Sequence, residues 1–440
     1  MNTASKLIQS IETRQSLIGV IGLGYVGIPL SICFLEAGFQ VLGFDQDQAK
    51  VDSINKGQSC LSHIDNSLID SYVTSRRLCA TADMHKLNEP DVVLICVPTP
   101  TTDDKNPDLA YLMDAIKHIA NSLRTGQLIC LESTPYPGAT EELLLPSLQT
   151  KEIIVGRDFF LAFSPEREDP GNTQYKISSI PKIVSGTTSE CLKIVESLYS
   201  GVFNKVFPVS STQTAECTKL IENIYRHVNI SFVNELKQIL ARMEVDIWEV
   251  LEAASTKPFG FHPFSPGPGI GGHCIPNNPI YFSWKANQLG MDSQIINSAL
   301  SVEKSMASYV YETAKRALTN QKKNLADSKI LILGVTYKPN IQDTRESPAL
   351  PIIKLLQESG ATVEYSDPYV PILQSSDVKT GEMHSSPVTK KALGMFDLVM
   401  LITDHSSFPY QLIHEHSALI IDTRNAFRRN SFTGDHVVQA

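Results

Sequence analysis

The chain has 440 residues, of which 42% are hydrophobic and 19% are charged, and its formal net charge is −9. This length exceeds what one hydrophobic core supports, so we expect two or three domains. The acidic balance, without any cluster of Lys or Arg, argues against binding to nucleic acid. No apolar run reaches the ~18 residues of a membrane helix, so we expect no membrane association.

The cysteines and the N-terminal segment indicate a compartment. None of the eight cysteines belongs to a CxxC pair or has a metal-ligand spacing, so we expect neither a disulfide framework nor a bound metal. The segment "MNTASKLIQSIETRQS" lacks the apolar core of a signal peptide. We therefore expect a protein of the reducing cytoplasm.

Residues 17–45 predict the first part of a nucleotide-binding fold. The segment "LIGVI" at 17–21 is the continuous apolar run of a buried parallel strand, and a helix to Glu36 and a strand to Asp45 follow it. The turn between the first strand and the helix is "GLGYVG" at 22–27. A GxGxxG pattern in this setting, with an acidic residue 23 positions after its first glycine, indicates a dinucleotide site.

The three glycines and the aspartate have separate roles in such a site. Gly22 permits the tight turn, Gly24 lets the backbone approach a pyrophosphate, and Gly27 permits close packing of the helix on the strand. Asp45 would accept hydrogen bonds from the ribose hydroxyls, and its charge would repel a 2′-phosphate. We therefore expect NAD rather than NADP as the cofactor.

Two further strands, at 91–100 and 126–133, continue the alternation and predict a doubly wound parallel sheet. Residues 209–257 contain neither Gly nor Pro and carry apolar residues at helical spacing. We interpret them as one long helix that links two halves of the chain and offers a face for a homodimer. Two shorter helices separated by a turn are the alternative.

The same pattern recurs near the C-terminus. It predicts a strand at 329–338, a helix at 347–360, a strand at 361–368 that ends near Asp367, and a further strand at 396–405. We interpret this region as a second Rossmann-like domain that has lost its glycine pattern but could still bind a nucleotide. The predicted fold class is therefore α/β, with two Rossmann-like doubly wound parallel-sheet domains joined by a long central helix. The predicted domains are 1–208 for NAD binding, 209–318 for dimerisation and a cysteine loop, and 319–440 for the second Rossmann-like domain.

Residues 266–279 form the cysteine loop. Eight of these fourteen residues are Gly or Pro, so we expect neither a helix nor a central strand there. Cys274 is either a buried apolar filler, as free cysteines usually are, or a reactive thiol. The second interpretation rests on Gly271 and Gly272, which would let main-chain N–H groups converge and favour a thiolate. His273, beside the cysteine, is either a base or a packing residue.

A dinucleotide site together with a loop cysteine favours the reactive thiol. Two hydride transfers to NAD take a primary alcohol to an acid, but the aldehyde carbon must become tetrahedral before the second transfer. A thiolate achieves this by forming a thiohemiacetal, which is oxidised to a thioester and then hydrolysed.

Seven segments occur in a specific order along the chain: "GVIGLGYVGIPLS", "VPTPTTDDKNPDL", "ESTPYPGAT", "FSPEREDPGN", "AECTKLIENIYRHVNISFVNEL", "FHPFSPGPGIGGHCIPNNPIY" and "GVTYKPNIQDTRESPAL". With them the chain resembles the nucleotide-sugar 6-dehydrogenases, the family of UDP-glucose dehydrogenase, from Gly19 to near Arg424. The branch that acts on acetamido sugars is the most similar, because "SPEREDPG" and "GGHCIP" stand where the glucose branch has "PEFLxEG" and "GGSC". The resemblance implies UDP-N-acetylglucosamine as the first choice of substrate and UDP-N-acetylmannosamine as the second, with UDP-glucose and UDP-N-acetylgalactosamine open. It also implies a pathway to a surface polysaccharide, such as a capsule or O-antigen, and a C-terminal domain that binds the UDP-sugar.

The resemblance implies a role for each matching residue. Cys274 would be the nucleophile, and Lys219 and Asn223, one turn apart on the long helix, would face the reacting carbon, with Lys219 stabilising the oxyanion. Thr134 would position a water, and Glu166 would act as general base in thioester hydrolysis. The residues implied in NAD binding are Gly22, Gly24, Tyr25, Val26, Gly27, Asp45, Pro98, Thr99, Thr134 and Arg345. The residues implied in UDP-sugar binding are Glu166, Arg167, Lys219, Asn223, Phe264, Gly271, Lys338 and Arg424.

One position departs from the family pattern. Four residues after the cysteine the family usually has Asp, and this chain has Asn278. Asparagine can donate and accept hydrogen bonds but holds no charge. Either Asn278 orients the water while Glu166 acts alone, or the second oxidation is slow; we expect the first.

Two other classes of protein remain as alternatives. An NAD-dependent hydroxy-acid dehydrogenase also has an N-terminal Rossmann domain, a long helix and a Lys/Asn pair, but it needs no cysteine and forms one NADH per turnover. A non-catalytic nucleotide-sugar binder is favoured only by Asn278. Loss of activity in Cys274→Ser, or two NADH per substrate, would separate the first choice from both.

Overall fold

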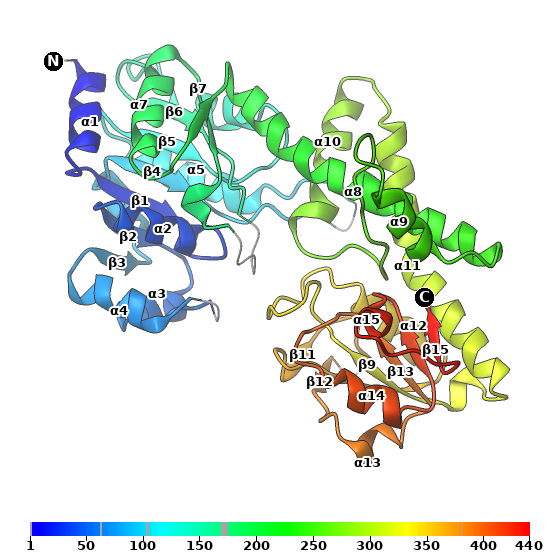
Figure 1. The fold of residues 1–440 in the computed structure, drawn as a ribbon. Coiled ribbons are helices and arrows are strands. Elements are labelled where there is room, and N and C mark those ends of the chain that lie inside the picture. Colours follow the sequence, from blue (N-terminus) through cyan, green and yellow to red (C-terminus); the bar gives the residue numbers. More distant parts are fainter. Residues whose placement is uncertain (1, 62–63, 103, 105, 169–174, 380) are drawn as a thin grey trace. The chain divides into compact units, whose positions relative to one another are not determined.

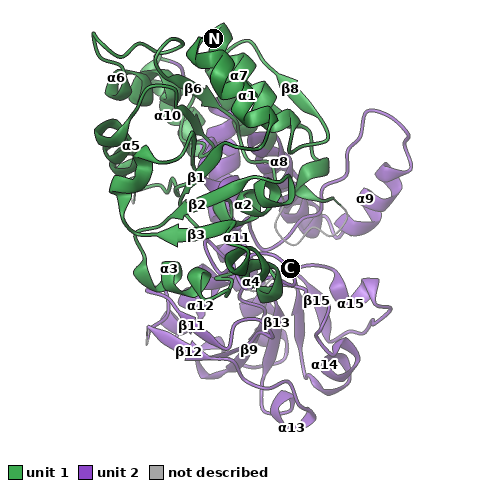
Figure 2. Ribbon diagram, turned by 90° about the vertical axis from the view of Figure 1, so that its left-hand side faces the viewer, with its two compact units in different colours: residues 1–222, 280–290 green, residues 223–279, 291–440 purple. Residues whose placement is uncertain are grey.

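The computed structural model of the chain describes residues 2–61, 64–102, 104, 106–168, 175–379 and 381–440. The chain forms two compact units, which are residues 1–222 with 280–290 and residues 223–279 with 291–440 (Figure 2). Each unit has its own sheet and its own hydrophobic core.

The first unit is built on an eight-stranded sheet. Its strands are β1 (Leu17–Ile21), β2 (Gln40–Phe44), β3 (Leu78–Thr81), β4 (Val92–Ile95), β5 (Leu128–Leu131), β6 (Phe160–Phe163), β7 (Lys182–Gly186) and β8 (Val206–Pro208). Their order is β3-β2-β1-β4-β5-β6-β7-β8, and β6 and β7 are the antiparallel pair in an otherwise parallel sheet (Figure 1). The order reverses between β1 and β4, which is where doubly wound sheets bind their ligands.

Helices cover both faces of this sheet. They are α1 (Thr3–Glu12), α2 (Gly27–Glu36), α3 (Gln48–Asn55), α4 (Asn66–Thr74), η1 (Met84–Asn88), α5 (Ala110–Ser122), η2 (Thr140–Leu144), α6 (Leu145–Leu148), η3 (Ile177–Ser179) and α7 (Ser189–Ser200). One core cluster joins strand residues such as Leu94 to α1, α2, α3, α4 and α7, and another joins Val93 to α5 and α6. Adjacent strand residues point to opposite faces, so both faces need apolar side chains, as "LIGVI" predicted.

The second unit contains a five-stranded parallel sheet. Its strands are β9 (Lys329–Leu333), β10 (Thr362–Ser366), β13 (Leu398–Leu401), β14 (Ile420–Asp422) and β15 (Val437–Gln439), and β11 (Ile372–Gln374) and β12 (Glu382–His384) form a separate antiparallel pair. The sheet order is β10-β9-β13-β14-β15. The remaining elements are α9 (Ile247–Ser255), α11 (Gln294–Asn320), η4 (Leu325–Asp327), α12 (Ala349–Glu358), α13 (Lys390–Leu393), α14 (Tyr410–His416) and α15 (Ala426–Arg429). Core clusters lie on both faces, one with α11 and α12 and one with α14 and α15.

These elements confirm the predicted fold class of two Rossmann-like parallel sheets and a long helix. The long helix is α8 (Thr212–Arg242), with 31 residues. It does not continue to residue 257, because Glu244 adopts a left-handed φ of 54° and the Asp246 side chain caps a new helix, α9. The structure therefore has the alternative of two helices. Among the described residues, no helix is long and apolar enough to cross a membrane.

The prediction that residues 266–279 contain no helix is wrong in its second half. Helix α10 (Cys274–Gln288) begins at the cysteine itself. Pro276 lies in the first turn, where a backbone N–H has no helical partner, so its ring removes no hydrogen bond. Pro279 lies inside the helix, where a proline removes one.

Candidate active site

The turn between β1 and α2 has the geometry of a dinucleotide site. Gly22 has a φ of +93°, and a Cβ there would lie 2.8 Å from the Cys96 carbonyl oxygen. A Cβ on Gly27 would lie 1.9 Å from the Gly22 carbonyl oxygen, so only glycine permits this approach of α2 to the turn. A Cβ on Gly24 would meet no atom of the described residues within 4 Å. The open space at Gly24, at the N-terminus of α2, fits a pyrophosphate.

Asp45 follows β2 and faces the same turn. Its Oδ2 accepts the Leu23 N–H at 2.9 Å and pairs with Lys50 Nζ at 2.9 Å. Oδ1 accepts the Asp47 N–H at 3.0 Å, and the side chain is 12% exposed, so a ribose hydroxyl would have to share an oxygen that already accepts a hydrogen bond. Lys50 is a residue that the sequence analysis missed; the signal would have been a basic residue five positions after Asp45, in the first turn of α3.

Other predicted NAD-binding residues lie at the same edge of the sheet. Pro98 and Thr99 follow β4, and Thr134 follows β5. The loops after β4 and β5 are tied together, because Ser133 Oγ donates to the Val97 carbonyl at 2.6 Å. Thr99 is buried, and its carbonyl accepts the Tyr281 hydroxyl. Tyr25 and Val26, in the first turn, are partly buried.

Glu166 and Arg167 follow β6. Oε1 of Glu166 accepts the N–H groups of Arg167 and Glu168, each at 2.6 Å. The Arg167 guanidinium is bound to both oxygens of Glu222, at 2.5 and 3.2 Å, which makes it a structural tie in addition to any substrate contact. The rest of this predicted motif, residues 169–174, lies outside the described residues.

Helix α8 carries a stripe of polar residues at four-residue spacing, which places them on one helix face. Lys219 is partly exposed and Asn223 is buried, with its Oδ1 accepting from Arg226. His227 is also buried, and among the described residues neither of its ring nitrogens has a hydrogen-bond partner. Burial lowers the pKa of His227 to about 4, so the imidazole is neutral. The sequence analysis missed His227, although the spacing 219, 223, 227 was visible.

The first half of the cysteine loop is held at several points of the second unit. Asn234 of α8 accepts the Gly267 N–H at 2.8 Å, and Glu303 of α11 accepts the Ile270 N–H. The Gly272 N–H donates to the Arg345 carbonyl at 3.0 Å. This N–H therefore does not point at the thiol. The predicted convergence of N–H groups on the thiol would require that it does.

The glycines beside the cysteine instead allow close packing. A Cβ on Gly271 would lie 2.5 Å from Tyr337 Cβ, and one on Gly272 would lie 2.8 Å from the Tyr337 ring. Any larger residue would push the loop away from the segment between β9 and α12. The loop is thus held against the second Rossmann-like sheet by its glycines.

Cys274 is exposed and is the first residue of α10. The N-terminus of a helix carries partial positive charge, which favours an anion such as a thiolate. Asn278 is buried one turn further on the same helix face, and Asn277 Nδ2 donates to the His273 carbonyl at 2.7 Å. Phe264 is held between aromatic neighbours, with its ring centroid 5.0 Å from that of His262 and 5.7 Å from that of Tyr225.

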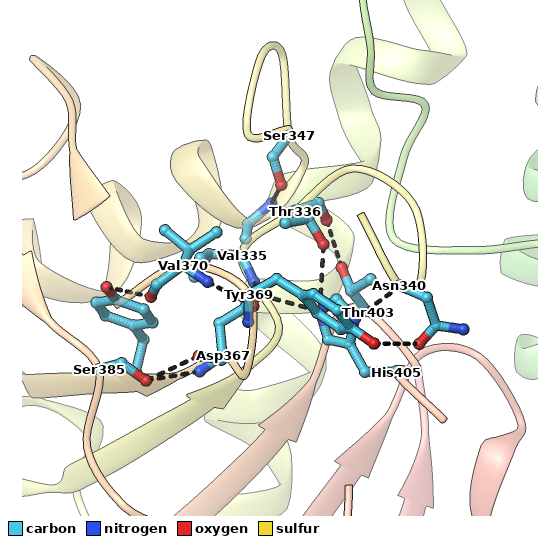
Figure 3. Close-up of polar contacts among 12 residues, drawn as sticks. Val335, Thr336, Asn340, Ser347, Asp367, Tyr369, Val370, Ser385, Thr403 and His405 are labelled. Atoms are coloured by element: carbon cyan, nitrogen blue, oxygen red, sulfur yellow. Dashed lines mark hydrogen bonds and ion pairs between the residues drawn. The ribbon is translucent and has the colours of Figure 1, made fainter. Parts of the chain in front are cut away.

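At the carboxyl ends of β9, β10 and β13, where a doubly wound sheet has its crevice, the second sheet carries a cluster of hydrogen-bonded polar residues (Figure 3). Asp367 is buried, and its carboxylate accepts the Val335 N–H at 2.9 Å and lies 3.0 Å from His405 Nε2. His405 Nδ1 accepts the Asn340 N–H at 2.9 Å, so the proton of the neutral ring is on Nε2. Thr336 lies 3.2 Å from Nε2 and donates to the carbonyl of Lys338 at 3.0 Å. The cluster thereby holds the loop that carries Lys338.

The two arginines predicted as site residues in the second unit already have partners: Arg345 is in an ion pair, and Arg424 is buried and hydrogen-bonded. Arg345 is half-exposed, and its guanidinium binds Asp343 at 2.6 Å. Arg424 donates through Nε to the Ile402 carbonyl at 2.9 Å, and burial lowers its pKa. A Cβ on Gly267 would lie 2.6 Å from an Arg424 nitrogen, so this guanidinium packs against the backbone of the cysteine loop.

A Rossmann-like sheet with the glycine turn at 22–27 and open space at Gly24 indicates the class of dinucleotide-binding proteins. Comparison with known proteins gives the family. Residues 16–203, 213–305 and 331–429 match the NAD-binding, central and UDP-binding domains of the UDP-glucose/GDP-mannose dehydrogenase family. The chain belongs to this family, and its cofactor is NAD.

Individual relatives differ in the sugar that their names specify. UDP-N-acetyl-D-glucosamine 6-dehydrogenase of Pseudomonas aeruginosa is 35% identical over 89% of this chain and 91% of its own. NDP-N-acetyl-D-galactosaminuronic acid dehydrogenase of Ralstonia solanacearum is 33% identical over 94% of this chain and 97% of its own. The structure of a UDP-D-ManNAc dehydrogenase from Pyrococcus horikoshii has a TM-score of 0.84 at 29% identity and covers 96% of this chain and 98% of that one.

Proposed function

We propose that the protein is a UDP-N-acetyl-D-glucosamine 6-dehydrogenase, which oxidises the C6 hydroxymethyl group of the sugar to a carboxylate in two steps. The observation that carries the proposal is the exposed Cys274 at the start of α10, on a glycine loop packed against the UDP-binding domain. The choice of sugar is supported by the 35% identity to the Pseudomonas aeruginosa enzyme. The product would serve a surface-polysaccharide pathway in the cytoplasm.

The cysteine supplies the covalent step. The Cys274 thiolate adds to the C6 aldehyde, and the resulting thiohemiacetal loses hydride to become a thioester. Lys219 and Asn223 stabilise the negative charge on oxygen in these steps. Water then displaces the thiol, with Glu166 accepting its proton and with Thr134 and Asn278 orienting it.

NAD, when bound, accepts one hydride in each of the two oxidations. The chain binds it through the Gly24 backbone, the N-terminus of α2 and the Asp45 carboxylate, with Lys50 balancing that carboxylate. Arg345 reaches the cofactor phosphates. Lys338, Arg424 and Phe264 bind the UDP-sugar.

The proposal is tested by following NADH with UDP-N-acetylglucosamine, UDP-N-acetylmannosamine, UDP-N-acetylgalactosamine and UDP-glucose. We expect UDP-N-acetylglucosamine to give the highest kcat/KM and two NADH per sugar. Cys274→Ser should form no acid. One NADH per substrate, or full conversion by Cys274→Ser, would support a hydroxy-acid type of dehydrogenase and refute the thiol mechanism.

The role of Asn278 has its own comparison. The wild type should release acid without free aldehyde, and Asn278→Asp should give the same acid yield per NADH. Aldehyde trapped from the wild type but not from Asn278→Asp would show that asparagine slows the second oxidation.

We also propose that the protein is a homodimer through α8. Four apolar side chains on this helix, Ile221, Tyr225, Phe232 and Ile239, are between 48% and 55% exposed. The last three are seven residues apart, which gives a stripe along one helix face. Light scattering should show a dimer for the wild type and a monomer for Phe232→Glu/Ile239→Glu; a monomeric wild type would refute the proposal.

A further inference from the structure

Lys182 is a buried cation beside the loop that carries Glu166, and the reaction proposed above does not use it. It is the first residue of β7, and its side chain is 3% exposed. Its Nζ donates to the Glu132 carboxylate at 2.6 Å and to the Pro165 carbonyl at 3.1 Å, and it lies 3.8 Å from Oε2 of Glu166. One ammonium therefore faces two carboxylates and binds the backbone of the residue before Glu166.

Glu132 and Tyr199 hold this ammonium in place. The two oxygens of the fully buried Glu132 accept from different donors, Oε2 from Lys182 and Oε1 from the Tyr199 hydroxyl. Burial raises the pKa of Tyr199, so the hydroxyl keeps the proton that it donates. The Tyr199 and Phe203 rings lie 5.1 and 5.5 Å from Nζ, within range of a cation–π interaction.

The Lys182 side chain is charged in this setting. Burial opposes the charged form, but the interactions with Glu132 and Glu166 outweigh it and raise the pKa of Lys182. Burial also raises the pKa of Glu132, to about 7, and the neighbouring Lys182 acts against this rise. A buried ion pair adds little stability compared with apolar side chains of the same volume. Fold stability alone therefore gives a weak reason for placing this pair next to Glu166.

The two oxygens of Glu166 have different surroundings. Oε1 is bound by two backbone N–H groups of its own loop, at 2.6 Å each. Oε2 faces Lys182 at 3.8 Å, which is beyond hydrogen-bond distance. Oε2 is therefore the oxygen that can accept a proton from a water molecule.

We propose that Lys182 is a positioning residue for thioester hydrolysis, in which the ammonium, anchored by Glu132 and Tyr199, holds the Glu166 carboxylate and the preceding Pro165 carbonyl in place, so that Oε2 of Glu166 is directed at the attacking water. The inference rests on the proposed role of Glu166 as general base. In this step the water oxygen bonds to the thioester carbonyl carbon, and one water proton passes to Oε2. The C–S bond then breaks, which releases the product carboxyl group and the Cys274 thiolate.

The position of this step in the reaction gives a specific test. Both hydride transfers precede hydrolysis, so Lys182→Met should leave their rates unchanged. In stopped-flow measurements with the most active UDP-sugar, this variant should form a burst of two NADH per subunit at the wild-type rate. The steady-state rate should then fall by about 30-fold or more, the size expected for a general base that is out of place. Mass spectrometry of the quenched enzyme should show an acyl adduct on Cys274.

Two further variants control the interpretation. Lys182→Arg keeps the positive charge and should restore most of the steady-state rate. Lys182→Met/Glu132→Gln removes both buried charges, so it tests the same step if Lys182→Met alone fails to fold. Thermal unfolding of each variant reports on the fold. An equal loss in the burst and the steady state, or a wild-type steady state in a folded Lys182→Met or double variant, would overturn the proposal.

Glu166→Gln separates this inference from the proposed function. It should show the same burst and the same acyl adduct as Lys182→Met. If Glu166→Gln accumulates the adduct and the Lys182 variants do not, the role of Lys182 is wrong and that of Glu166 stands. If Glu166→Gln accumulates no adduct, the general base is wrong and the inference about Lys182 falls with it.

Discussion

The two Rossmann-like sheets have the same backbone hydrogen bonds at the turn after their first strand, but they differ in the side chains at that turn. In the first crevice the Leu23 N–H donates to Asp45 Oδ2 at 2.9 Å, and in the second the Val335 N–H donates to Asp367 Oδ2 at 2.9 Å. The residue before each donor is a glycine that bonds to the last residue of the neighbouring strand, at 2.8 and 2.9 Å. By this correspondence Thr336 occupies the position of Gly24.

That one position separates an open crevice from a closed one. Around Gly24 an added Cβ meets nothing, whereas Thr336 is buried and lies 3.2 Å from His405. The Asp45 side chain is 12% exposed, and the Asp367 side chain is 0% exposed beside His405. The second aspartate is therefore enclosed beside His405, whereas the first stays partly exposed, as the proposed ribose contact requires. A fold shared by two domains does not imply a shared ligand.

The largest effect is expected for Gly24→Thr, which gives the first crevice the residue that the second has at Thr336. Gly24→Thr should weaken NAD binding by about 100-fold or more, because its side chain occupies the space of the pyrophosphate. The melting temperature and UDP affinity should change little, since an added Cβ at Gly24 meets no atom of the described residues within 4 Å. Calorimetric titration with NAD and with UDP measures both affinities. The matched control, Gly27→Ala, clashes with Gly22 and should lower the melting temperature; wild-type NAD affinity in Gly24→Thr would break the comparison.

Opening the second crevice should cost stability. His405→Leu takes a hydrogen-bond donor away from the buried Asp367 carboxylate and should lower the free energy of unfolding by about 2 kcal/mol. UDP should also bind more weakly, because the Asn340 N–H and the loop of Lys338 lose their support. Urea unfolding and UDP titration are the measurements. NAD affinity should stay unchanged, and a loss of less than about 1 kcal/mol would show that the cluster is not a structural support.

Replacing Asp45 should alter the preference between NAD and NADP, whereas replacing Asp367 should not. Asp45→Ser removes the charge that repels a 2′-phosphate and leaves Lys50 free to bind one. The ratio of kcat/KM for NADP to that for NAD should rise by about 10- to 100-fold. Asp367→Ser should leave this ratio unchanged, which steady-state kinetics with both coenzymes will show. A change of equal size in both variants would contradict the assignment of the first crevice to the coenzyme.

The smallest effect is expected at the ion pair of the first crevice. Lys50→Met breaks a partly exposed pair with Asp45, and such pairs contribute about 0–1 kcal/mol. Thermal unfolding should therefore shift little, in contrast to His405→Leu. A loss as large as that of His405→Leu would mean that Asp45 is as firmly held as Asp367.

Much of the first crevice was predictable because its signals are local. The glycines at 22, 24 and 27 and the aspartate at 45 are set by backbone sterics and by one strand-turn-helix unit, so their spacing is visible in the sequence. The start of α10 at Cys274 was not predicted, because proline in a first turn permits a helix that its composition argues against. The glycines at 271 and 272 were expected to let N–H groups converge on the thiol, but the Gly272 N–H donates to Arg345 instead. Both glycines pack against Tyr337, which is distant in the sequence.

By itself the sequence determined the fold class, the NAD crevice, the family and the cysteine as a candidate nucleophile, because these follow from periodicity and from motifs within short segments. Only the tertiary structure decided that His405 closes the second crevice, across 38 residues of sequence, and that Lys182 reaches Glu132, across 50. Both pairs join different strands or the loops that directly follow them. Which strands become neighbours is a result of sheet order, and a buried charge finds its partner only after that order is set.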